Sequence, residues 1–379
     1  MMTGTIKLGD AATFVNGYPF KPETWTEEGL PIIRIQNLNN PNAAFNRFSG
    51  SIPEKYLVRK GDILISWSAS LGAYEWAGED AYLNQHIFKV VFNKSPIDKH
   101  FLRYAVQSKL SEMEKEAHGA TMRHIVKKDF DGTLIPYPSL QEQERIVAEL
   151  DSLSGILDKQ EEQLKELDTL AQSVFYDMFG NPMENEKGWV MQDLGRVIRV
   201  KGRVGWKGYK KEDLRDYGPL AIGGSHLADD GSLDLSAPVY LSREKYEESP
   251  EIMVETGDLI LVQRGTIGKI GLVNKDIGEA TINPCVLILR PITIDSIYAL
   301  HFFLNKDTQR YLQTLIRGVA QPMITQQQVN AIRMPIPPIS LQKSFAERIE
   351  SIERQKNSIN QAISETQNLF DYTMDKYFG

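Results

Sequence analysis

The side chains best suited to chemistry in this sequence are basic and amide residues in loops. From Arg196 to Lys211 the sequence RVIRVKGRVGWKGYKK holds seven basic residues and no acidic one, with Trp206 and Tyr209 between them. Basic side chains neutralise phosphates, glycines let a loop follow its ligand, and aromatic rings stack on bases or wedge between them. This composition favours nucleic-acid binding over a merely soluble basic loop.

A second basic loop runs from His118 to Lys128, and its counterpart later in the chain, beginning at Arg317, is rich in glutamine instead. Arg, Asn and Gln read base edges through paired hydrogen bonds. An exchange of basic for amide residues between equivalent loops would therefore suit two different target sequences. Taken singly, each of these residues is more often plain surface than a contact.

No catalytic constellation is found. The string Asn283–Val286 lacks the second proline and the aromatic residue of an amino-methyltransferase motif, and we expect it to be a buried strand. The glycines of GTIGKIG, residues 265–271, follow neither the dinucleotide nor the Walker spacing. The six histidines show no metal-ligand spacing, and no lysine stands two residues after an acidic one as in common restriction nucleases.

The chain is built twice. RKGDILISWSASLG at 59–72 parallels ETGDLILVQRGTIG at 255–268, and from Asn84 and Asn283 onward the halves keep an offset of 199 residues. Such a repeat indicates one framework carrying two different surfaces. The predicted order is a globular part, a long helix, a second globular part and a second long helix. Their boundaries are residues 1–138, 139–180, 181–338 and 339–379.

Within each half the pattern predicts the same elements. Short strands at Asp62–Ser66 and Leu259–Val262 are each entered by a Gly-Asp turn. A helix is expected over about 98–115 in the first half and about 296–315 in the second, since apolar residues recur there at helical spacing. Prolines then separate each globular part from its long helix.

The long helices are predicted from an apolar ladder with alternating steps of three and four residues, which is the seam of a coiled coil. We expect the two helices to pair with each other, antiparallel and related by an approximate two-fold axis. The second seam is more polar, with Lys356 at the position of Leu157. The predicted seam contains Ile146, Leu150, Leu153, Leu157, Ile349, Ile352, Ile359 and Ile363.

Composition sets the broad class. The 379 residues are 41% hydrophobic and 25% charged, which is ordinary for a soluble globular protein of two or three domains. Residues 139–180 carry ten acidic and three basic residues, so most of the net charge of −7 lies on the first long helix. That face suits protein partners better than phosphate. No membrane span or signal peptide is seen, the single Cys285 lies in an apolar run, and the cytoplasm is the expected compartment.

These features together resemble the specificity subunits (HsdS) of type I restriction-modification systems. The likeness is carried by the doubled arrangement, by a Gly-Ala-Thr loop at 119–121, by a Phe-Gly close to each half, and by IRIQNL at 33–38. A Pro-x-Pro-x-Leu-x-Glu-Gln entry at 136–143 leads into the first long helix. The second half departs at Val319 and Ala320, and Leu341 precedes Gln342 where the pattern has Glu.

The resemblance implies an α+β fold with two repeated target recognition domains and no activity of the chain's own. Each domain would read one half of an interrupted site in double-stranded DNA, with the helices as spacer. Two methyltransferase subunits would bring S-adenosylmethionine and methylate adenine, and restriction subunits using ATP and Mg can join. No cofactor, metal or membrane is expected for this chain itself.

Two rival functions remain open at this point. One is a coiled-coil scaffold that holds proteins without reading DNA, and the other is a self-contained modification enzyme, which the missing methyltransferase motifs disfavour. For the DNA-reading function we expect contacts from polar loops at equivalent places in the two halves. The expected residues are Arg34, Asn37, Trp67, Ser68, Arg123, His124, Lys127, Lys201, Arg203, Lys207, Lys210, His226, Arg264, Arg317 and Gln321.

Overall fold

The two predicted long helices are present in this computed structural model as α5 (Leu140–Phe179) and α11 (Ile339–Phe378), each of 40 residues. No proline or glycine interrupts either helix except Gly155, which lies within α5. The described residues contain no helix long and apolar enough to cross a membrane. The structure describes residues 4–40, 42–68, 70–116, 127–203, 208–318 and 321–379.

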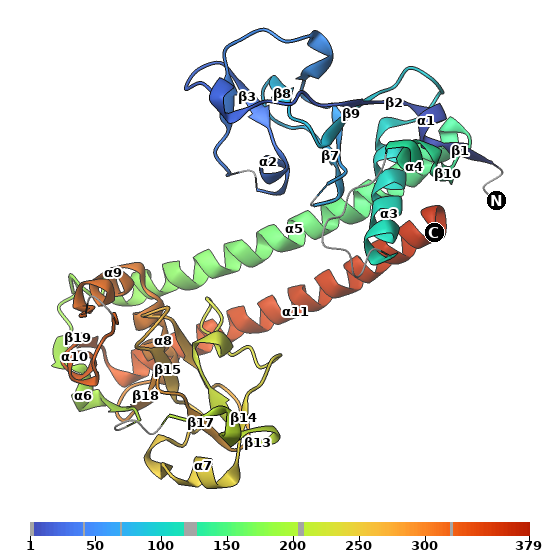
Figure 1. Cartoon of the computed structure of the whole chain (residues 1–379). Helices are drawn as coiled ribbons and strands as arrows, with labels where there is room; N and C mark the ends of the chain where they lie inside the picture. Colours follow the sequence, from blue (N-terminus) through green and yellow to red (C-terminus); the bar gives the residue numbers. More distant parts are fainter. Residues whose placement is uncertain (1–3, 41, 69, 117–126, 204–207, 319–320) are drawn as a thin grey trace. The chain divides into compact units, whose positions relative to one another are not determined.

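The chain divides into two compact units. Unit 1 consists of Met1–Glu161 with Gln361–Gly379, and unit 2 consists of Glu162–Asn360. Each unit therefore combines one globular part with a segment of both long helices (Figure 1). The boundary falls inside the helices rather than at the ends of the globular parts.

The described residues of unit 1 form two four-stranded sheets and a short two-stranded pair. The first sheet has the antiparallel order β2-β9-β6-β7, and the second has the order β4-β3-β8-β5 with β3 parallel to β8. The strands are β1 (Thr5–Lys7), β2 (Thr13–Asn16), β3 (Leu30–Ile33), β4 (Asn46–Phe48), β5 (Leu57–Val58), β6 (Ile63–Ser66), β7 (Gly72–Glu75), β8 (Ala81–Leu83), β9 (Ile87–Val91) and β10 (Leu134–Pro136).

Unit 2 repeats this plan. Its four-stranded sheet has the order β12-β18-β15-β16, and in its second sheet, β14-β13-β17, strand β13 is again parallel to β17. The sequence repeat is therefore a repeat of topology, which confirms the predicted α+β fold. The strands are β11 (Val190–Asp193), β12 (Ile198–Lys201), β13 (Leu214–Ile222), β14 (Tyr240–Leu241), β15 (Leu259–Val262), β16 (Ile270–Leu272), β17 (Ala280–Ile282), β18 (Val286–Pro291) and β19 (Arg333–Ile336).

Shorter helices complete both units, and one prediction about them is wrong. The single helix expected over 296–315 is two helices, because Asn305 has an extended backbone (φ −60°, ψ 134°) and starts a new helix. Its side-chain oxygen accepts hydrogen bonds from the backbone of Asp307 and Thr308, at 2.9 and 3.3 Å. The helices are α1 (Leu8–Ala11), α2 (Ile35–Asn39), α3 (Lys99–Glu116), α4 (Lys127–Gly132), α6 (Leu194–Val197), α7 (Arg243–Glu247), α8 (Ser296–Leu304), α9 (Lys306–Leu315) and α10 (Gln326–Asn330).

Both predicted Gly-Asp turns are present in the structure. Gly61 and Gly257 have φ of +90° and +94°, a conformation that glycine adopts without steric cost. The carboxylates of Asp62 and Asp258 each accept a hydrogen bond of 2.8 Å from the backbone three residues earlier. These closed turns begin β6 and β15.

The string around Cys285 is not a buried strand as predicted. Residues 283–285 form the turn between β17 and β18, with the Asn283 side-chain oxygen accepting from the backbone of Cys285 at 2.8 Å. Cys285 is exposed. The Asn-Pro pair accounts for the error, because it favours a turn over continuation of a strand.

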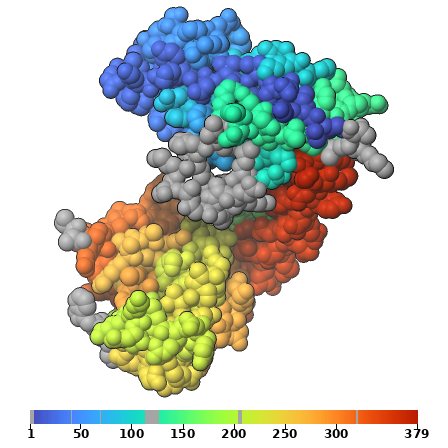
Figure 2. All heavy atoms as spheres, turned by 45° about the vertical axis from the view of Figure 1, so that its right-hand side comes forward, coloured from blue at the N-terminus to red at the C-terminus, as the bar shows by residue number. Residues whose placement is uncertain are grey.

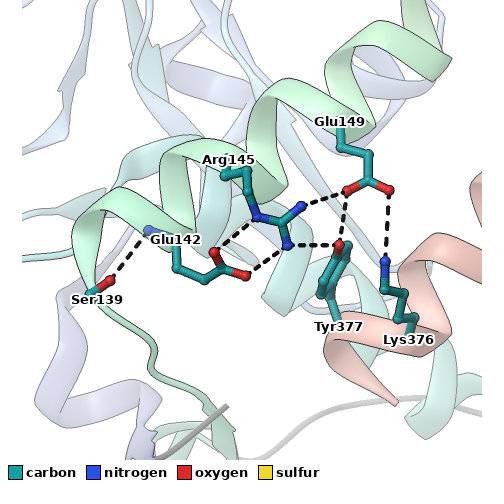
Figure 3. Close-up of polar contacts among 6 residues, drawn as sticks. All are labelled: Ser139, Glu142, Arg145, Glu149, Lys376 and Tyr377. Atoms are coloured by element: carbon teal, nitrogen blue, oxygen red, sulfur yellow. Dashed lines mark hydrogen bonds and ion pairs between the residues drawn. The ribbon is translucent and has the colours of Figure 1, made fainter. Parts of the chain in front are cut away.

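In unit 1 the helix segments pair antiparallel. Near the start of α5, the Arg145 guanidinium lies 2.9 Å from the Tyr377 hydroxyl at the end of α11. Further along α5, the Gln160 amide nitrogen lies 3.5 Å from the Thr366 hydroxyl, which is earlier in α11. The Tyr377 hydroxyl donates to Glu149 at 2.8 Å, and Figure 3 shows this network. Ile146 and Leu150 are fully buried beside it. Leu153, Leu157 and Ile363 are half-buried in the seam.

In unit 2 the remaining segments pair in the same sense. Ile349 and Ile352 of α11 are buried in one cluster with Phe175 and Phe179 of α5. Ile359 is half-buried. The seam is broken at Lys356, whose ammonium lies 3.0 Å from Asp168 of α5.

Each globular part is attached to its long helix through a buried glutamine at an equivalent position. The Gln143 side chain accepts from the backbone of Asp98 at 2.8 Å and donates to the Pro138 carbonyl at 2.9 Å. Gln342 makes the same two bonds, with Asp295 at 2.9 Å and Pro337 at 2.8 Å. Both glutamines are inaccessible to solvent. The Glu-to-Leu departure before Gln342 therefore leaves this attachment intact.

Candidate nucleic-acid interface

In unit 2 several loops meet at one end of the four-stranded sheet. Gln263, just after β15, donates its backbone N–H to the Cys285 carbonyl at 2.9 Å and its side-chain amide to the Pro284 carbonyl at 3.0 Å. The Gln263 carbonyl in turn accepts from Ile324 at 3.1 Å. The end of β15, the 283–285 turn and the loop after α9 are thus joined into one surface.

Two predicted arginines come together on this surface. Arg317 and Met323 exchange backbone hydrogen bonds of 3.0 and 2.9 Å, and Gln321, between them in the sequence, is exposed. Arg264 is bridged to Met323 as well, and its guanidinium lies 3.7 Å from the Met323 sulfur. Both guanidiniums are exposed, so their planar donors are available to a ligand.

The basic run reaches the same end of the sheet. Arg203 donates to the Ile282 carbonyl at 2.9 Å, and burial lowers the pKa of its guanidinium. Lys201 is half-buried at the end of β12, and Lys210 is exposed with its ammonium 3.5 Å from Glu212. Figure 2 shows the yellow-green segment after residue 208 on the surface of unit 2. Lys207 lies outside the described residues.

Asn37 and His226 are placed inside the fold rather than on its surface, each with 4% exposure. They occupy the same position, three residues into the short helix that follows β3 or β13. The Asn37 side chain accepts from the Arg34 N–H at 3.1 Å, and the His226 ring accepts from the Gly223 N–H at 3.0 Å. Their other polar atoms hold the following loop, at Ala43 and Ala237. Both residues therefore serve as internal caps.

Unit 1 has the same frame with other side chains. Trp67, which corresponds to Gln263, donates its backbone N–H to the His86 carbonyl at 3.4 Å. Its indole stacks on Phe88 with ring centres 5.5 Å apart and donates to Asn16 at 3.3 Å. Ser68 is buried, with 6% exposure. A large aromatic surface thus stands where unit 2 presents an amide.

Two further basic residues of the predicted set lie in unit 1. Lys127 is exposed at the start of α4, with its ammonium 5.3 Å from the centre of the Phe88 ring and 2.9 Å from Asp131. Arg34 lies over the Trp25 ring at 5.3 Å and donates to Asn46 at 3.1 Å. Arg123 and His124 lie outside the described residues.

The polar groups on these surfaces are suited to recognition of a ligand. Among the described residues no group of three His, Cys, Asp or Glu side chains could hold a metal ion. Exposed arginine and glutamine side chains can form paired hydrogen bonds with base edges, and lysines can neutralise phosphates. Sequence reasoning missed Gln263, although aligning the two repeats places it opposite Trp67.

Comparisons with known proteins agree with this description. The model of the type I restriction modification DNA specificity domain matches the chain twice, at residues 3–168 and 187–366. The chain is 25% identical to the type I restriction enzyme EcoBI specificity subunit of Escherichia coli, over 98% of this chain and 85% of that protein. It is 24% identical to the MjaVIII specificity subunit of Methanocaldococcus jannaschii, over 96% of this chain and 91% of that protein.

Solved structures share the fold. A chain from a structure of type I restriction-modification complex assembly has a TM-score of 0.62 at 18% identity, covering 99% of this chain and 97% of that one. The specificity subunit from M. genitalium has a TM-score of 0.54 at 16% identity, covering 99% and 96%. Because the family model covers most of the sequence in two copies, this chain belongs to the type I restriction-modification DNA specificity subunits, whose part is recognition rather than catalysis.

Proposed function

We propose that unit 1 and unit 2 each read one half of an interrupted DNA site. The observation that carries this proposal is the shared frame at the same end of the two sheets. Trp67 and Gln263 make the same backbone bond to the following turn, while the exposed side chains around them differ. One frame with two surfaces is what reading two unlike sequences requires.

In unit 2 the exposed guanidiniums of Arg264 and Arg317 and the amide of Gln321 are the proposed base-reading groups. Arginine pairs with the two acceptors of guanine, and glutamine pairs with adenine. Lys201 and Lys210 are proposed to contact phosphates, since a lysine is a flexible point charge with no preference among bases. In unit 1, Trp67, which stands at the place of Gln263, and the exposed Lys127 are the proposed contacts.

The proposed partners follow from the family. The relatives are named as specificity subunits of restriction enzymes, and we propose that methyltransferase subunits, two for each chain, bind this one around its helices. They would supply S-adenosylmethionine for adenine methylation, and restriction subunits would supply ATP- and Mg-dependent cleavage. The exposed acidic residues Glu144, Glu161 and Glu166 of α5 support a protein partner there, because like charge repels phosphate.

Selection from random duplexes tests the proposal. The chain, assembled with the methyltransferase subunit of its own system, is incubated with a library of random double-stranded DNA, and bound sequences are read. We expect two fixed half-sites separated by a constant number of unspecified base pairs. Enrichment of one continuous site, or of none, would contradict the proposal.

A matched pair of variants assigns the halves. Arg264→Ala removes an exposed guanidinium from unit 2, and Lys127→Ala removes an exposed ammonium from unit 1. Under the proposal Arg264→Ala relaxes base choice in one half-site by about tenfold or more, because a good paired contact is worth roughly 1–3 kcal/mol. Lys127→Ala leaves that half-site unchanged. Relaxation of both half-sites by either variant would show that the units do not read separately.

A further inference from the structure

The two halves of the helix seam differ in charge at Lys356. The ladder position that holds Leu157 in α5 holds this lysine in α11. Its side chain has only 11% exposure, and its ammonium lies 3.0 Å from Asp168 and 3.1 Å from Glu353. Burial opposes its charge, but the hydrogen bonds to these two carboxylates outweigh burial and raise its pKa. A charged lysine thus replaces an apolar contact.

A third carboxylate reaches Lys356 from the globular part of unit 2. Asp230 lies in the loop that follows His226, with one carboxylate oxygen 3.9 Å from the ammonium. Its other oxygen accepts from the backbone and hydroxyl of Ser232, at 2.9 and 2.7 Å. Burial opposes ionisation of Asp230, but the bonds from Ser232 and the charge of Lys356 outweigh it and lower its pKa. The hydrogen bonds from Ser232 therefore fix the orientation of the Asp230 carboxylate toward Lys356.

The tip of this loop is also fixed by its backbone. Gly231 has φ of +88°, and its carbonyl accepts from Leu272 at 2.9 Å. A Cβ at this glycine would lie 2.9 Å from the side chain of Leu300. The loop therefore fits closely between β16 and α8, and its carboxylate is presented to α11 from a rigid support.

The contact between Lys356 and Asp230 lies at one end of the surface where the globular part of unit 2 packs on α11. The globular part of unit 2 packs on α11 through Phe345, Ile349 and Ile352, which are buried in one cluster with Tyr298 of α8. Lys356 lies eleven residues beyond Phe345, about 16 Å further along the helix. The apolar attachment ends at Ile352, one helical turn before Lys356, so the contact with Asp230 extends it along the helix and opposes rotation of the globular part.

We propose that Lys356 and Asp230 form a polar strut that fixes the angle of the globular part of unit 2 on the helix pair, and thereby restricts the half-site spacing the chain accepts. Unit 1 is built differently at the corresponding places. Its seam residue is Leu157, and the end of helix α2 is held to strand β7, where the Tyr74 hydroxyl donates to Asn39 at 2.8 Å. The spacing role rests on the function proposed above, whereas the strut itself does not.

The chain supplies a matched control for the strut. Asp229, the neighbouring residue, pairs with Lys269 of the same globular part at 3.0 Å, and its side chain is 97% exposed. Asp230→Asn and Asp229→Asn each remove one carboxylate from one loop. Asn at 230 keeps an oxygen for Ser232, so the turn is preserved while the charge facing Lys356 is lost.

The first measurement needs no DNA. Hydrogen exchange of residues 227–233 is followed in the chain with its methyltransferase subunit. We expect about three- to tenfold faster exchange in Asp230→Asn and in Lys356→Met, no further increase in the double variant, and wild-type exchange in Asp229→Asn. Equal effects of Asp229→Asn and Asp230→Asn, or additive effects of Asp230→Asn and Lys356→Met, would overturn the strut.

The second measurement compares binding to the selected site with binding to the same site after one base pair is added to or removed from the spacer. Asp230→Asn and Lys356→Met should lower the wild-type preference for the correct spacer by about three- to tenfold, with both half-sites still read. If the wild-type complex shows no spacer preference, the function proposed above fails. If it does and the two variants keep the full preference, the inference about the strut fails alone.

Discussion

Units 1 and 2 differ least in their backbone hydrogen bonds and most in the side chains those bonds present. Trp67 and Gln263 each donate the backbone N–H to the turn before the neighbouring strand of the sheet, β9 or β18, and Asn37 and His226 cap the equivalent short helix. Backbone hydrogen bonds and a buried cap residue are common to both frames, so other side chains at the edge can change without refolding. The comparison teaches that a reading surface can be replaced while its support is retained.

The largest expected effect comes from the aromatic residues that close each half. Phe179 is buried against Tyr298 at 4.8 Å, and Phe378 against Phe101 at 5.1 Å, measured between ring centres. Replacing either with Ala should cost about 3–5 kcal/mol of unfolding free energy, because a large buried ring leaves a cavity. Urea unfolding of both variants checks this. A cost in one unit only would break the equivalence of the two halves.

The glutamine attachments come next. Gln143→Ala and Gln342→Ala each leave a buried N–H and a buried carbonyl without their partner, which should cost about 3 kcal/mol. Equal costs are expected, since the bond lengths agree within 0.1 Å. Glu142→Ala, on the exposed side of the same turn, serves as the control and should change stability by less than about 1 kcal/mol. Unequal glutamine costs would mean that one globular part is attached by other contacts.

Acid stability should separate the two units. Asp98 and Asp295 hold the same place before α3 and α8 but are 197 residues apart, so the predicted constant offset of 199 is interrupted here. Six residues further on, Tyr104 of unit 1 and His301 of unit 2 also hold the same place. Burial, with a smaller contribution from the charge of Lys356, lowers the pKa of His301 from 6.5 to about 4. Between pH 6.5 and pH 4, His301 is therefore protonated in the unfolded chain and neutral in the folded chain. Stability is full above pH 6.5 and falls as the pH approaches 4, by about 2 kcal/mol at pH 5.

Urea unfolding at pH 7 and pH 5 measures this effect. His301→Leu should lose less stability than the wild-type chain between these two pH values. Tyr104→Phe is the control, because burial first, and then the hydrogen bond to Asp151, raise the pKa of its hydroxyl well above this range. An unchanged pH dependence in His301→Leu would contradict the burial argument.

The smallest effect concerns phosphate contacts. Lys210→Ala should weaken binding to all duplexes alike and reduce the slope of log K against log salt by about 1. Lys275→Ala, an exposed lysine in another loop of unit 2, is the control and should leave the slope unchanged. Titrations at several salt concentrations decide between them, and identical slopes for both variants and wild type would remove Lys210 from the interface.

Much of the fold could be predicted because the sequence contains it as two repeats. The repeat located both globular parts, the apolar ladder located α5 and α11, and the Gly-Asp turns located β6 and β15. The break at Asn305 was missed because its capping bonds interrupt an apolar pattern that continues through α8 and α9. The turn at Asn283 was missed because its apolar neighbours outweighed the Asn-Pro signal.

The candidate site was predicted less well, for a physical reason. Polar type and loop position cannot distinguish an exposed Arg264 from a buried His226, because the cap of a short helix needs a polar side chain just as a base does. Gln263 was overlooked since its role depends on a turn distant in sequence. The sequence shows Lys356 as a polar exception in the seam, but its contact with Asp230 of the globular part can be seen only in the structure.

The most direct test of separate reading is the methylation pattern of genomic DNA in cells that express this chain with its methyltransferase subunit. Adenine methylation is mapped by sequencing for the wild type and for Arg264→Ala combined with Arg317→Ala. Our account predicts that one half-site becomes degenerate while the other half-site and the spacer length stay unchanged. Degeneracy in both halves, or an unchanged pattern, would contradict it.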